Sequence, residues 1–319
     1  MASLFDEIRA ACAEVARRAR SVRIVEERIA DYGPALPLHE TVAPEHDAAT
    51  HYLGQGDDTL AFFLTLDSIN FGSGYFPHLR KRPGMSGYFT IASSLNDYYR
   101  AHGPLSAQQL SQLTTNDCAE LFGQTPLQPP IDELMGFFAQ ALNDLGNLLL
   151  TEYGGSFRAL VDAAQGSGER LARILSRMPL FRDEAEYDGL RVPIYKRAQI
   201  VVADIALAFN NQGPGAFYDL DELTIFADNL VPHVLRHDGI LRYSDELAAR
   251  IEREELIEAG SPEEVELRAC ALHAVELISA SLRQQGHDIK PRQLDYLLWN
   301  RGQRYKEGKP RHRSRSVFY

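Results

Sequence analysis

The chain has 319 residues and a formal net charge of −11 at pH 7, with 45% hydrophobic and 24% charged residues. This composition is typical of a globular protein with one large core or two packed lobes, and no apolar run reaches the ~18 residues of a membrane span. The cysteines, Cys12, Cys118 and Cys270, are too few and too widely spaced for a disulfide framework, so we expect a cytoplasmic protein without a membrane partner.

The charge is distributed unevenly along the chain. Residues 290–319 contain nine Lys and Arg against two Asp and Glu, a local charge of +7, which leaves −18 for the remaining 289 residues. An acidic body disfavours non-specific wrapping of DNA or RNA, so no direct nucleic-acid partner is expected. The basic segment 309–315 is interpreted as a solvated terminus, with a phosphate contact as the alternative, although the apolar Val317 and Phe318 favour docking of this end.

Helical periodicity dominates the sequence. Apolar residues recur every three or four positions in long segments, which predicts helices over 3–20, 131–151, 194–209 and 291–305. The segment 194–209 is apolar nearly all round, as is typical of a buried helix. Ser156, Ser167 and Ser261 each precede a helical pattern and are predicted N-caps.

Strand patterns are few. Short apolar runs at Leu60–Leu66 and Tyr88–Ala92 are the best candidates, and Gly189–Ile194 is a weaker one. We therefore expect a mainly α fold with a small β element near residues 60–95. No internal repeat or low-complexity linker interrupts the chain, which predicts a single mostly helical domain over 1–319, with two lobes that have the active site between them as a variant of this arrangement.

Asp228 is the most informative carboxylate. It precedes the helical pattern 229–236, and the simplest interpretation is a helix N-cap. Phe226 and Ala227 before it and Leu230 after it predict a partly buried position, where an unpaired carboxylate is costly. A helix N-terminus also keeps a carboxylate ionised, which suits a group that faces an oxocarbenium-like ribosyl centre. The pattern alone leaves both interpretations open.

Lys196 and Arg197 begin the apolar helix. Positive charge at a helix N-terminus opposes the helix dipole, so a bound phosphate or the carboxylate of Asp228 would relieve the repulsion. The alternative is that both side chains extend to solvent, which stays credible for Arg197.

The last predicted helix carries a carboxylate beside the only Trp of the chain. Asp295 and Trp299 are four residues apart and share one face, and Tyr296 and Asn300 directly follow them. A carboxylate there could hydrogen-bond the edge of a base while aromatic rings stack on it; the alternative is a Trp that packs in the core. The segment Asp67–Phe71 has a similar combination of residues, although its Asp, Ser and Asn are also plain turn formers.

Metal chemistry is not indicated by the sequence. His39, His46 and His51 match no zinc-binding spacing, and Pro44 interrupts any helix that could align them. No P-loop, nucleophile-elbow or dinucleotide fingerprint occurs. We expect neither a metal nor a cofactor.

Six segments of the chain resemble the queuosine salvage protein family, with the same order and similar spacing from about His51 to Tyr319. The segments are Asp67–Phe71 (DSINF), Ser86–Phe89 (SGYF), Tyr195–Ile200 (YKRAQI), Phe226–Asp228 (FAD), Gly239–Ser244 (GILRYS) and Leu294–Trp299 (LDYLLW). The family is known as queuosine 5′-phosphate N-glycosylases, which hydrolyse the nucleotide to queuine and ribose 5-phosphate, so that the freed base can be reinserted into tRNA. Its fold is similar to that of the helical DNA glycosylases.

The resemblance implies a role for each candidate residue. Asp228 would be the catalytic carboxylate, as nucleophile or as stabiliser of the ribosyl cation. Lys196, together with Arg197, would contact the phosphate or Asp228. The residues expected to bind the base are His51, Phe226, Asp295, Tyr296 and Asn300.

Two other functions fit parts of the pattern. A base glycosylase that acts on DNA or RNA would need a basic groove, which the acidic body disfavours. A non-catalytic protein that binds a modified base would use Asp228 only as a helix cap. The sequence leaves the oligomeric state and the tolerance for related 7-deazaguanine nucleotides open.

Overall fold

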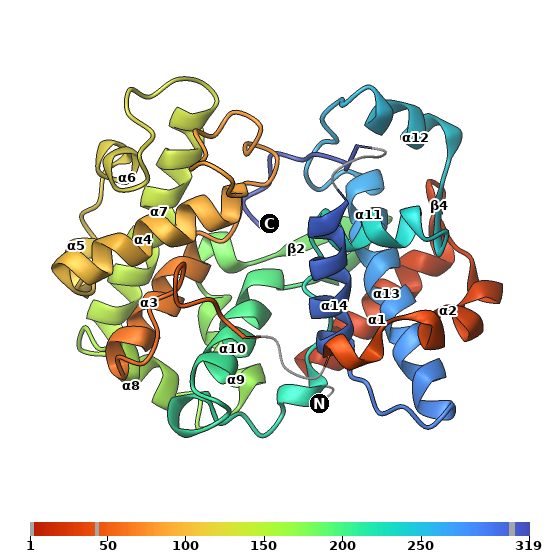
Figure 1. The fold of residues 1–319 in the computed structure, drawn as a ribbon, viewed down its shortest axis with the longest axis horizontal. Coiled ribbons are helices and arrows are strands. Elements are labelled where there is room, and N and C mark those ends of the chain that lie inside the picture. The colour runs from red at the N-terminus through yellow and green to blue at the C-terminus, as the bar shows by residue number, and fades with distance from the viewer. Residues whose placement is uncertain (1–2, 42–44, 306–309) are drawn as a thin grey trace. The chain divides into compact units, whose positions relative to one another are not determined.

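The computed structural model describes residues 3–41, 45–305 and 310–319. Regular structure within these residues is mostly helical, with four short strands in two antiparallel pairs (Figure 1). The prediction of a mainly α fold is therefore confirmed, whereas the similarity to helical DNA glycosylases stays a prediction. No helix in the described part of the chain is both long and apolar enough to cross a bilayer.

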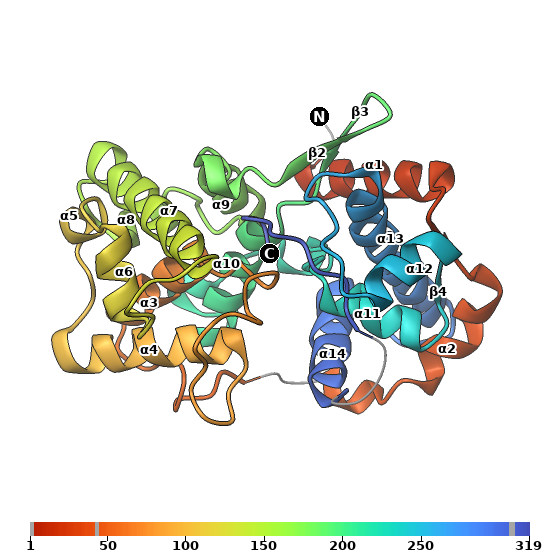
Figure 2. The same cartoon turned by 90° about the horizontal axis from the view of Figure 1, so that it is seen from above.

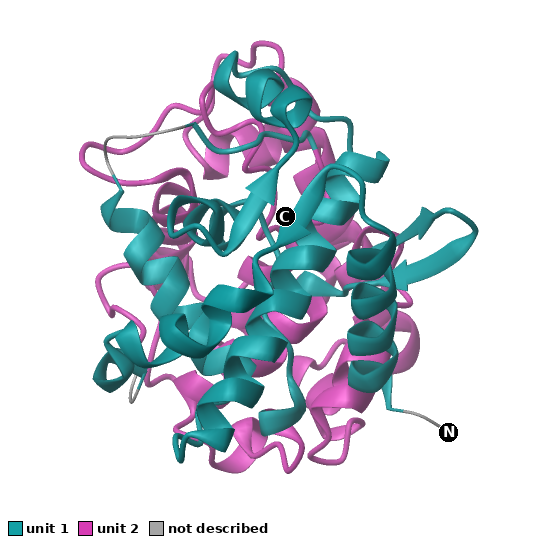
Figure 3. Ribbon diagram, turned by 90° about the vertical axis from the view of Figure 1, so that its right-hand side faces the viewer, with its two compact units in different colours: residues 1–44, 183–196, 221–315 teal, residues 45–182, 197–220, 316–319 magenta. Residues whose placement is uncertain are grey.

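The chain forms two compact units, each assembled from segments that are distant in sequence (Figure 3). Unit 1 contains residues 1–44, 183–196 and 221–315. Unit 2 contains residues 45–182, 197–220 and 316–319. The expected single domain, and its variant with two lobes and the active site between them, stay predictions.

Unit 1 is centred on one long helix. Its helices are α1 (Leu4–Arg18), α2 (Ile29–Ala35), α11 (Leu230–His237), α12 (Asp245–Glu252), α13 (Pro262–Gln284) and α14 (Pro291–Arg304). Helix α13 is buried along most of its length, and α1, α2, α11 and α14 all pack on it. Ser261 caps α13, since its Oγ accepts a hydrogen bond from the Glu264 amide at 3.4 Å, as the sequence predicts.

Both strand pairs belong to unit 1. Strand β1 (Val22–Ile24) runs antiparallel to β4 (Leu241–Tyr243). Strands β2 (Glu184–Tyr187) and β3 (Leu190–Pro193) form a hairpin beside α1 (Figure 2). The weak strand prediction at Gly189–Ile194 is therefore confirmed. The hairpin ends three residues before Lys196, so it leads the chain directly to that residue.

Unit 2 is built on helices α3 to α10. These are α3 (Asp57–Ser68), α4 (Gly87–His102), α5 (Ala107–Leu110), α6 (Thr115–Leu121), α7 (Ile131–Glu152), α8 (Phe157–Asp162), α9 (Gly168–Leu175) and α10 (Lys196–Ala208), of which Lys196 alone belongs to unit 1. Helices α5 and α6 pack on α7, and α3 contacts α4, α7 and α8 (Figure 1). Ser156 and Ser167 cap α8 and α9 as predicted.

The prediction of a small β element near residues 60–95 is wrong. Residues 60–66 lie in α3, and residues 88–92 lie in α4. Every residue of α3 from Thr59 to Ser68 is buried, so this helix lacks the polar face by which a helix is normally recognised. A short continuous apolar run does not distinguish a buried helix from a buried strand.

The interpretation of the basic segment 309–315 as a solvated terminus is also wrong for the part that the structure describes; residues 306–309 lie outside the described residues. The Arg313 carbonyl accepts a hydrogen bond from the Ile257 amide at 2.8 Å within unit 1. In unit 2, the carbonyl of the buried Tyr319 accepts one from the Gly72 amide at 2.9 Å. Backbone pairing and burial of an aromatic ring therefore fix a segment that its charge alone would leave in solvent.

Candidate functional site

Asp228 lies at the N-terminus of α11. Its Oδ1 accepts hydrogen bonds from the amides of Leu230 at 2.7 Å and Val231 at 3.3 Å. The first amides of a helix have no partner within it, so the carboxylate caps α11 as the sequence predicts. The positive end of the helix dipole stabilises negative charge at this position. Both bonds go to one oxygen and the residue is only partly buried, so the cap orients the carboxylate without enclosing it.

The residues immediately before Asp228, 223–227, form a buried segment that is apolar except for Thr224. The ring of Phe226 lies edge-on to the ring of Tyr296 on α14, with 6.1 Å between centroids and 75° between planes. This arrangement is a favourable one for two aromatic rings. The structure thus brings two of the predicted base-binding residues together next to the predicted catalytic carboxylate.

Two buried side chains bind the backbone of this segment. Asp295 accepts a hydrogen bond at Oδ1 from the Phe226 amide at 2.9 Å. Arg268, on α13, donates from Nε to the Ala227 carbonyl at 2.9 Å. The peptide groups that lead into Asp228 are therefore fixed by one acceptor and one donor. Asp295, predicted to contact the base, uses one of its oxygens for this backbone contact.

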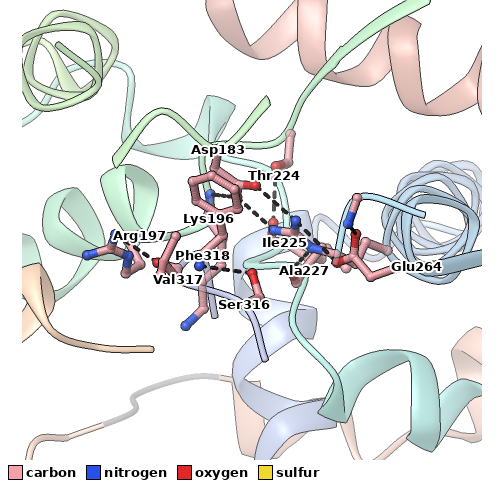
Figure 4. Close-up of polar contacts among 12 residues, drawn as sticks. Asp183, Lys196, Arg197, Thr224, Ile225, Ala227, Glu264, Ser316, Val317 and Phe318 are labelled. Atoms are coloured by element: carbon pink, nitrogen blue, oxygen red, sulfur yellow. Dashed lines mark hydrogen bonds and ion pairs between the residues drawn. The ribbon is translucent and has the colours of Figure 1, made fainter. Parts of the chain in front are cut away.

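Arg268 is also one half of a buried ion pair. Its Nη1 and Nη2 donate to Oδ1 and Oδ2 of Asp183 at 2.9 and 2.7 Å, a parallel two-bond geometry that suits guanidinium and carboxylate. Oδ2 of Asp183 also accepts the amide of Lys196 at 3.0 Å (Figure 4). Because Lys196 is the first residue of α10, Asp183 supplies the acceptor that this helix N-terminus needs. The Lys196 residue is only 5% exposed.

Arg197, the other predicted phosphate contact, belongs to unit 2 and is 1% exposed. Its guanidinium donates to the carbonyl of Val317 (Figure 4). It also donates to the carbonyl of Ser68, at the end of α3. Its Cζ lies 4.6 Å from the ring centroid of Phe71 and 4.4 Å from that of Phe181. A cation at a helix C-terminus and over aromatic rings is well stabilised. These contacts favour a structural role for Arg197 over a phosphate contact.

His51 also belongs to unit 2. Its Nε2 lies 3.0 Å from the hydroxyl of Tyr88 and its Nδ1 lies 2.9 Å from that of Thr50. Its ring is stacked on Phe63, with an interplanar angle of 13°. Burial lowers the pKa of His51 to about 4, so the imidazole is neutral at pH 7. A neutral stacked ring suits contact with a flat base better than proton transfer.

The remaining predicted residue, Asn300, is exposed on α14. Among the residues that the structure describes, no group of three or more His, Cys, Asp and Glu side chains is arranged to bind a metal ion.

Comparison with known proteins places this geometry in a family. A family model described as "Queuosine salvage protein" matches residues 50–319. The chain belongs to the queuosine salvage protein family. This finding confirms the resemblance that the six sequence segments indicated.

Several relatives of this queuosine salvage protein carry the name "Queuosine 5'-phosphate N-glycosylase/hydrolase". The one from Sphaerobacter thermophilus is 38% identical over 312 residues, which cover 96% of this chain and 95% of the relative. The one from Mus musculus is 34% identical over 246 residues, which cover 73% and 72% of the two chains. The one from Dictyostelium discoideum is 30% identical over 264 residues, which cover 82% and 78%.

Sequence reasoning missed two cations near Asp228 in this queuosine salvage protein. Arg268 lies inside a helical pattern, where nothing signals that its partners are Asp183 and Ala227. Arg311 lies within the basic segment 309–315, for which the charge pattern predicts a solvated terminus. Burial lowers the pKa of Arg311 from its ordinary value, and the charge of Asp228 opposes this shift. The available signal for Arg311 was the excess of basic residues in a chain that is otherwise acidic.

Proposed function

We propose that this queuosine salvage protein hydrolyses the N-glycosidic bond of queuosine 5′-monophosphate and releases queuine and ribose 5-phosphate. The observation that carries the proposal is the similarity to a relative named "Queuosine 5'-phosphate N-glycosylase/hydrolase" over 96% of this chain. The geometry at Asp228 supports the same reaction. The freed base would then be available for reinsertion into tRNA.

Asp228 is the proposed catalytic carboxylate. Cleavage of a ribosyl bond develops positive charge on the sugar, and a fixed negative charge stabilises that transition state more than mobile water does. The helix cap supplies the fixed orientation, and a buried, mostly apolar segment, 223–227, leads directly into this residue. The base is a 7-deazapurine, which has carbon in place of N7, so protonation of that atom cannot assist its departure. The reaction therefore depends more heavily on Asp228.

Base binding is assigned to the five predicted residues, with different contributions. Phe226 and Tyr296 offer aromatic surface on which a flat base can stack. Asp295 accepts a hydrogen bond from the Phe226 amide and so holds the backbone of Phe226 in place. It is also the proposed partner for the polar edge of the base. Asn300 and the neutral His51 are proposed as further base contacts.

The 5′-phosphate is assigned to Lys196. The backbone of this residue is fixed by Asp183, and its side chain carries a charge of the required sign. Binding of a remote group such as the phosphate supplies energy that orients the ribose at the reacting carbon. Arg197 is the less favoured partner because backbone carbonyls and aromatic rings surround its guanidinium.

The test is product analysis by chromatography after incubation of the purified protein with queuosine 5′-monophosphate or with queuosine. We expect queuine and ribose 5-phosphate in equal amounts from the nucleotide. We expect kcat/KM to be at least about 100-fold lower for the nucleoside, because it lacks the phosphate contact.

Three outcomes would contradict parts of the proposal. Tight binding of the nucleotide without release of queuine would identify a non-catalytic base-binding protein. Release from tRNA but not from the mononucleotide would identify an enzyme that acts on polymer. Equal kcat/KM for nucleotide and nucleoside would remove the phosphate from the recognition mechanism.

A further inference from the structure

We infer that the buried ion pair Arg268–Asp183 positions both Asp228 and Lys196, and thereby sets the rate of the proposed hydrolysis without touching the substrate. The inference rests on the proposed function. It concerns two residues that lie outside every segment on which the family resemblance was based.

Arg268 is connected to Asp228 through the peptide group that precedes Asp228. The Ala227 carbonyl, which accepts from Arg268 Nε at 2.9 Å, belongs to the same planar peptide group as the Asp228 amide. Fixing that carbonyl therefore holds the peptide group that ends at the Asp228 Cα, from which the carboxylate side chain leaves. The helix cap alone fixes only the other end of the residue, through the amides of Leu230 and Val231.

Arg268 can hold this carbonyl because Asp183 fixes its guanidinium. A guanidinium is planar, so two parallel bonds to Asp183 at 2.9 and 2.7 Å leave its Nε with one direction, toward Ala227. Arg268 is 2% exposed and Asp183 is 3% exposed, so water does not compete for these bonds. Glu264, on the same helix, adds a second carboxylate 3.6 Å from Nη1.

The same ion pair is also connected to Lys196. The Asp183 oxygen that accepts from Arg268 Nη2 also accepts the Lys196 amide at 3.0 Å. One carboxylate thus links the start of α10, with the proposed phosphate contact, to the segment that carries the proposed catalytic group. Within unit 1, Asp183, Lys196, Ala227 and Arg268 form one continuous hydrogen-bonded chain.

The energetics favour positioning over simple stabilisation. A buried ion pair pays a large desolvation cost, and apolar residues of similar volume often give equal or greater stability. A buried pair that also binds the backbone at Ala227, through Arg268 Nε, and at Lys196, through Asp183 Oδ2, is therefore better explained by the geometry that it imposes.

The test compares Arg268→Lys with wild type in the queuine-release assay. A lysine keeps the charge, but one ammonium group cannot make both parallel bonds to Asp183 and the bond to the Ala227 carbonyl. We expect kcat to fall about 10- to 100-fold while KM for queuosine 5′-monophosphate stays within about threefold, since Asp183 still accepts the Lys196 amide and so keeps the proposed phosphate contact in place. Asp183→Asn, which keeps the shape of the side chain, should also lower kcat. This variant tests the inference independently if Arg268→Lys does not fold.

A matched control lies on the same helix. Glu266 is 1% exposed and accepts the amides of Ser21 and Val22 at 2.6 and 3.0 Å, with no described contact to the segment 223–228. Glu266→Gln should lower the unfolding midpoint but leave kcat within about twofold. An equal loss of kcat in this control would mean that Arg268 acts only through general stability.

The deciding measurement is a double variant. If Arg268 acts through Asp228, adding Arg268→Lys to Asp228→Asn should lower the residual kcat by less than about twofold, because coupled residues give non-additive effects. Full additivity, or an unchanged kcat in Arg268→Lys alone, would overturn the inference while leaving the proposed function intact. A wild-type protein that releases no queuine would overturn both.

Discussion

At Asp228 the helix cap and the proposed chemistry need the same geometry. A cap requires an oxygen directed at the first amides of α11, and stabilisation of a ribosyl cation requires an ionised carboxylate in a fixed orientation. The two interpretations that the sequence left open are therefore compatible. They make different demands on the residue, because a cap needs only an acceptor oxygen whereas the reaction needs the charge.

This difference gives a pair of substitutions at one residue. Asp228→Asn keeps an acceptor for the Leu230 amide but removes the charge, so we expect the unfolding free energy to change by less than about 0.5 kcal/mol. Queuine release should fall by at least about 1,000-fold, the loss seen when a fixed electrostatic group is removed from a transition state. Asp228→Ala should lose the same activity and, in addition, about 1 kcal/mol of stability.

Ser261→Ala is the control for this pair. It removes the cap of α13 in the same unit and should also cost about 1 kcal/mol, with no change in kcat. Urea unfolding and the queuine-release assay measure both quantities. Full turnover by Asp228→Asn would leave Asp228 as a cap only and would exclude it as the catalytic carboxylate.

The packing of α11 against α14 controls where the cap of Asp228 lies. Gly302, on α14, is buried against α11, and a Cβ there would lie 2.5 Å from Leu230 Cδ1 and 2.9 Å from Val234 Cγ2. These distances are shorter than any normal contact between carbon atoms, so α11 and α14 approach as closely as they do because residue 302 has no side chain.

We therefore expect Gly302→Ala to cost about 1–3 kcal/mol through overpacking. Because α11 begins two residues after Asp228, the displacement should also lower kcat. Gly136→Ala, in α7, is the matched control: its Cβ would meet only Thr115 Oγ1 at 3.7 Å, so the better helix propensity of alanine should stabilise the protein by up to about 1 kcal/mol. Wild-type stability and kcat in Gly302→Ala would show that α11 tolerates an added methyl group here.

Elements with a polar face or a cap could be predicted from the sequence. The helices at 131–151 and 291–305 were found because their apolar residues recur at helical spacing, and α13 because Ser261 begins it. Helix α3 was mistaken for a strand because it is buried on all sides. Helical periodicity arises because one face of the helix contacts solvent and is polar. A helix that is buried on all sides has no polar face and therefore shows no such periodicity.

At the scale of the whole molecule, the candidate site could be predicted only where its residues are chemically unusual. Asp228, Phe226 and Asp295 are such residues, and the structure brings them together in unit 1. Arg268 and Asp183 are 85 residues apart, in two of the three segments that make up unit 1. Their pairing depends on how those segments fold together, which local spacing does not encode.

The buried histidines make the stability of the folded protein sensitive to acid. Burial lowers the pKa values of His51 and His233 to about 4 and that of His312 to about 3, from an ordinary value of 6.5. At a pH between the lowered pKa values of the folded protein and the ordinary value in the unfolded chain, the unfolded chain binds more protons than the folded one. The unfolding free energy therefore decreases as the pH falls. The contribution of these histidines to the stability is fully present above pH 6.5 and is lost progressively toward pH 4.

Urea unfolding at several pH values between 7.5 and 4 measures this loss. His233→Gln should reduce the slope of unfolding free energy against pH by up to about 1.4 kcal/mol per pH unit, which corresponds to one proton. Burial raises the pKa of Glu276, so this residue makes the unfolding free energy increase as the pH falls. Its contribution is the same in wild type and variant, and it cancels when the two are compared at each pH. An unchanged slope in His233→Gln would mean that His233 takes up its proton over the same pH range in the folded and the unfolded protein. Its burial beside Arg311, whose positive charge further disfavours protonation, argues for the opposite.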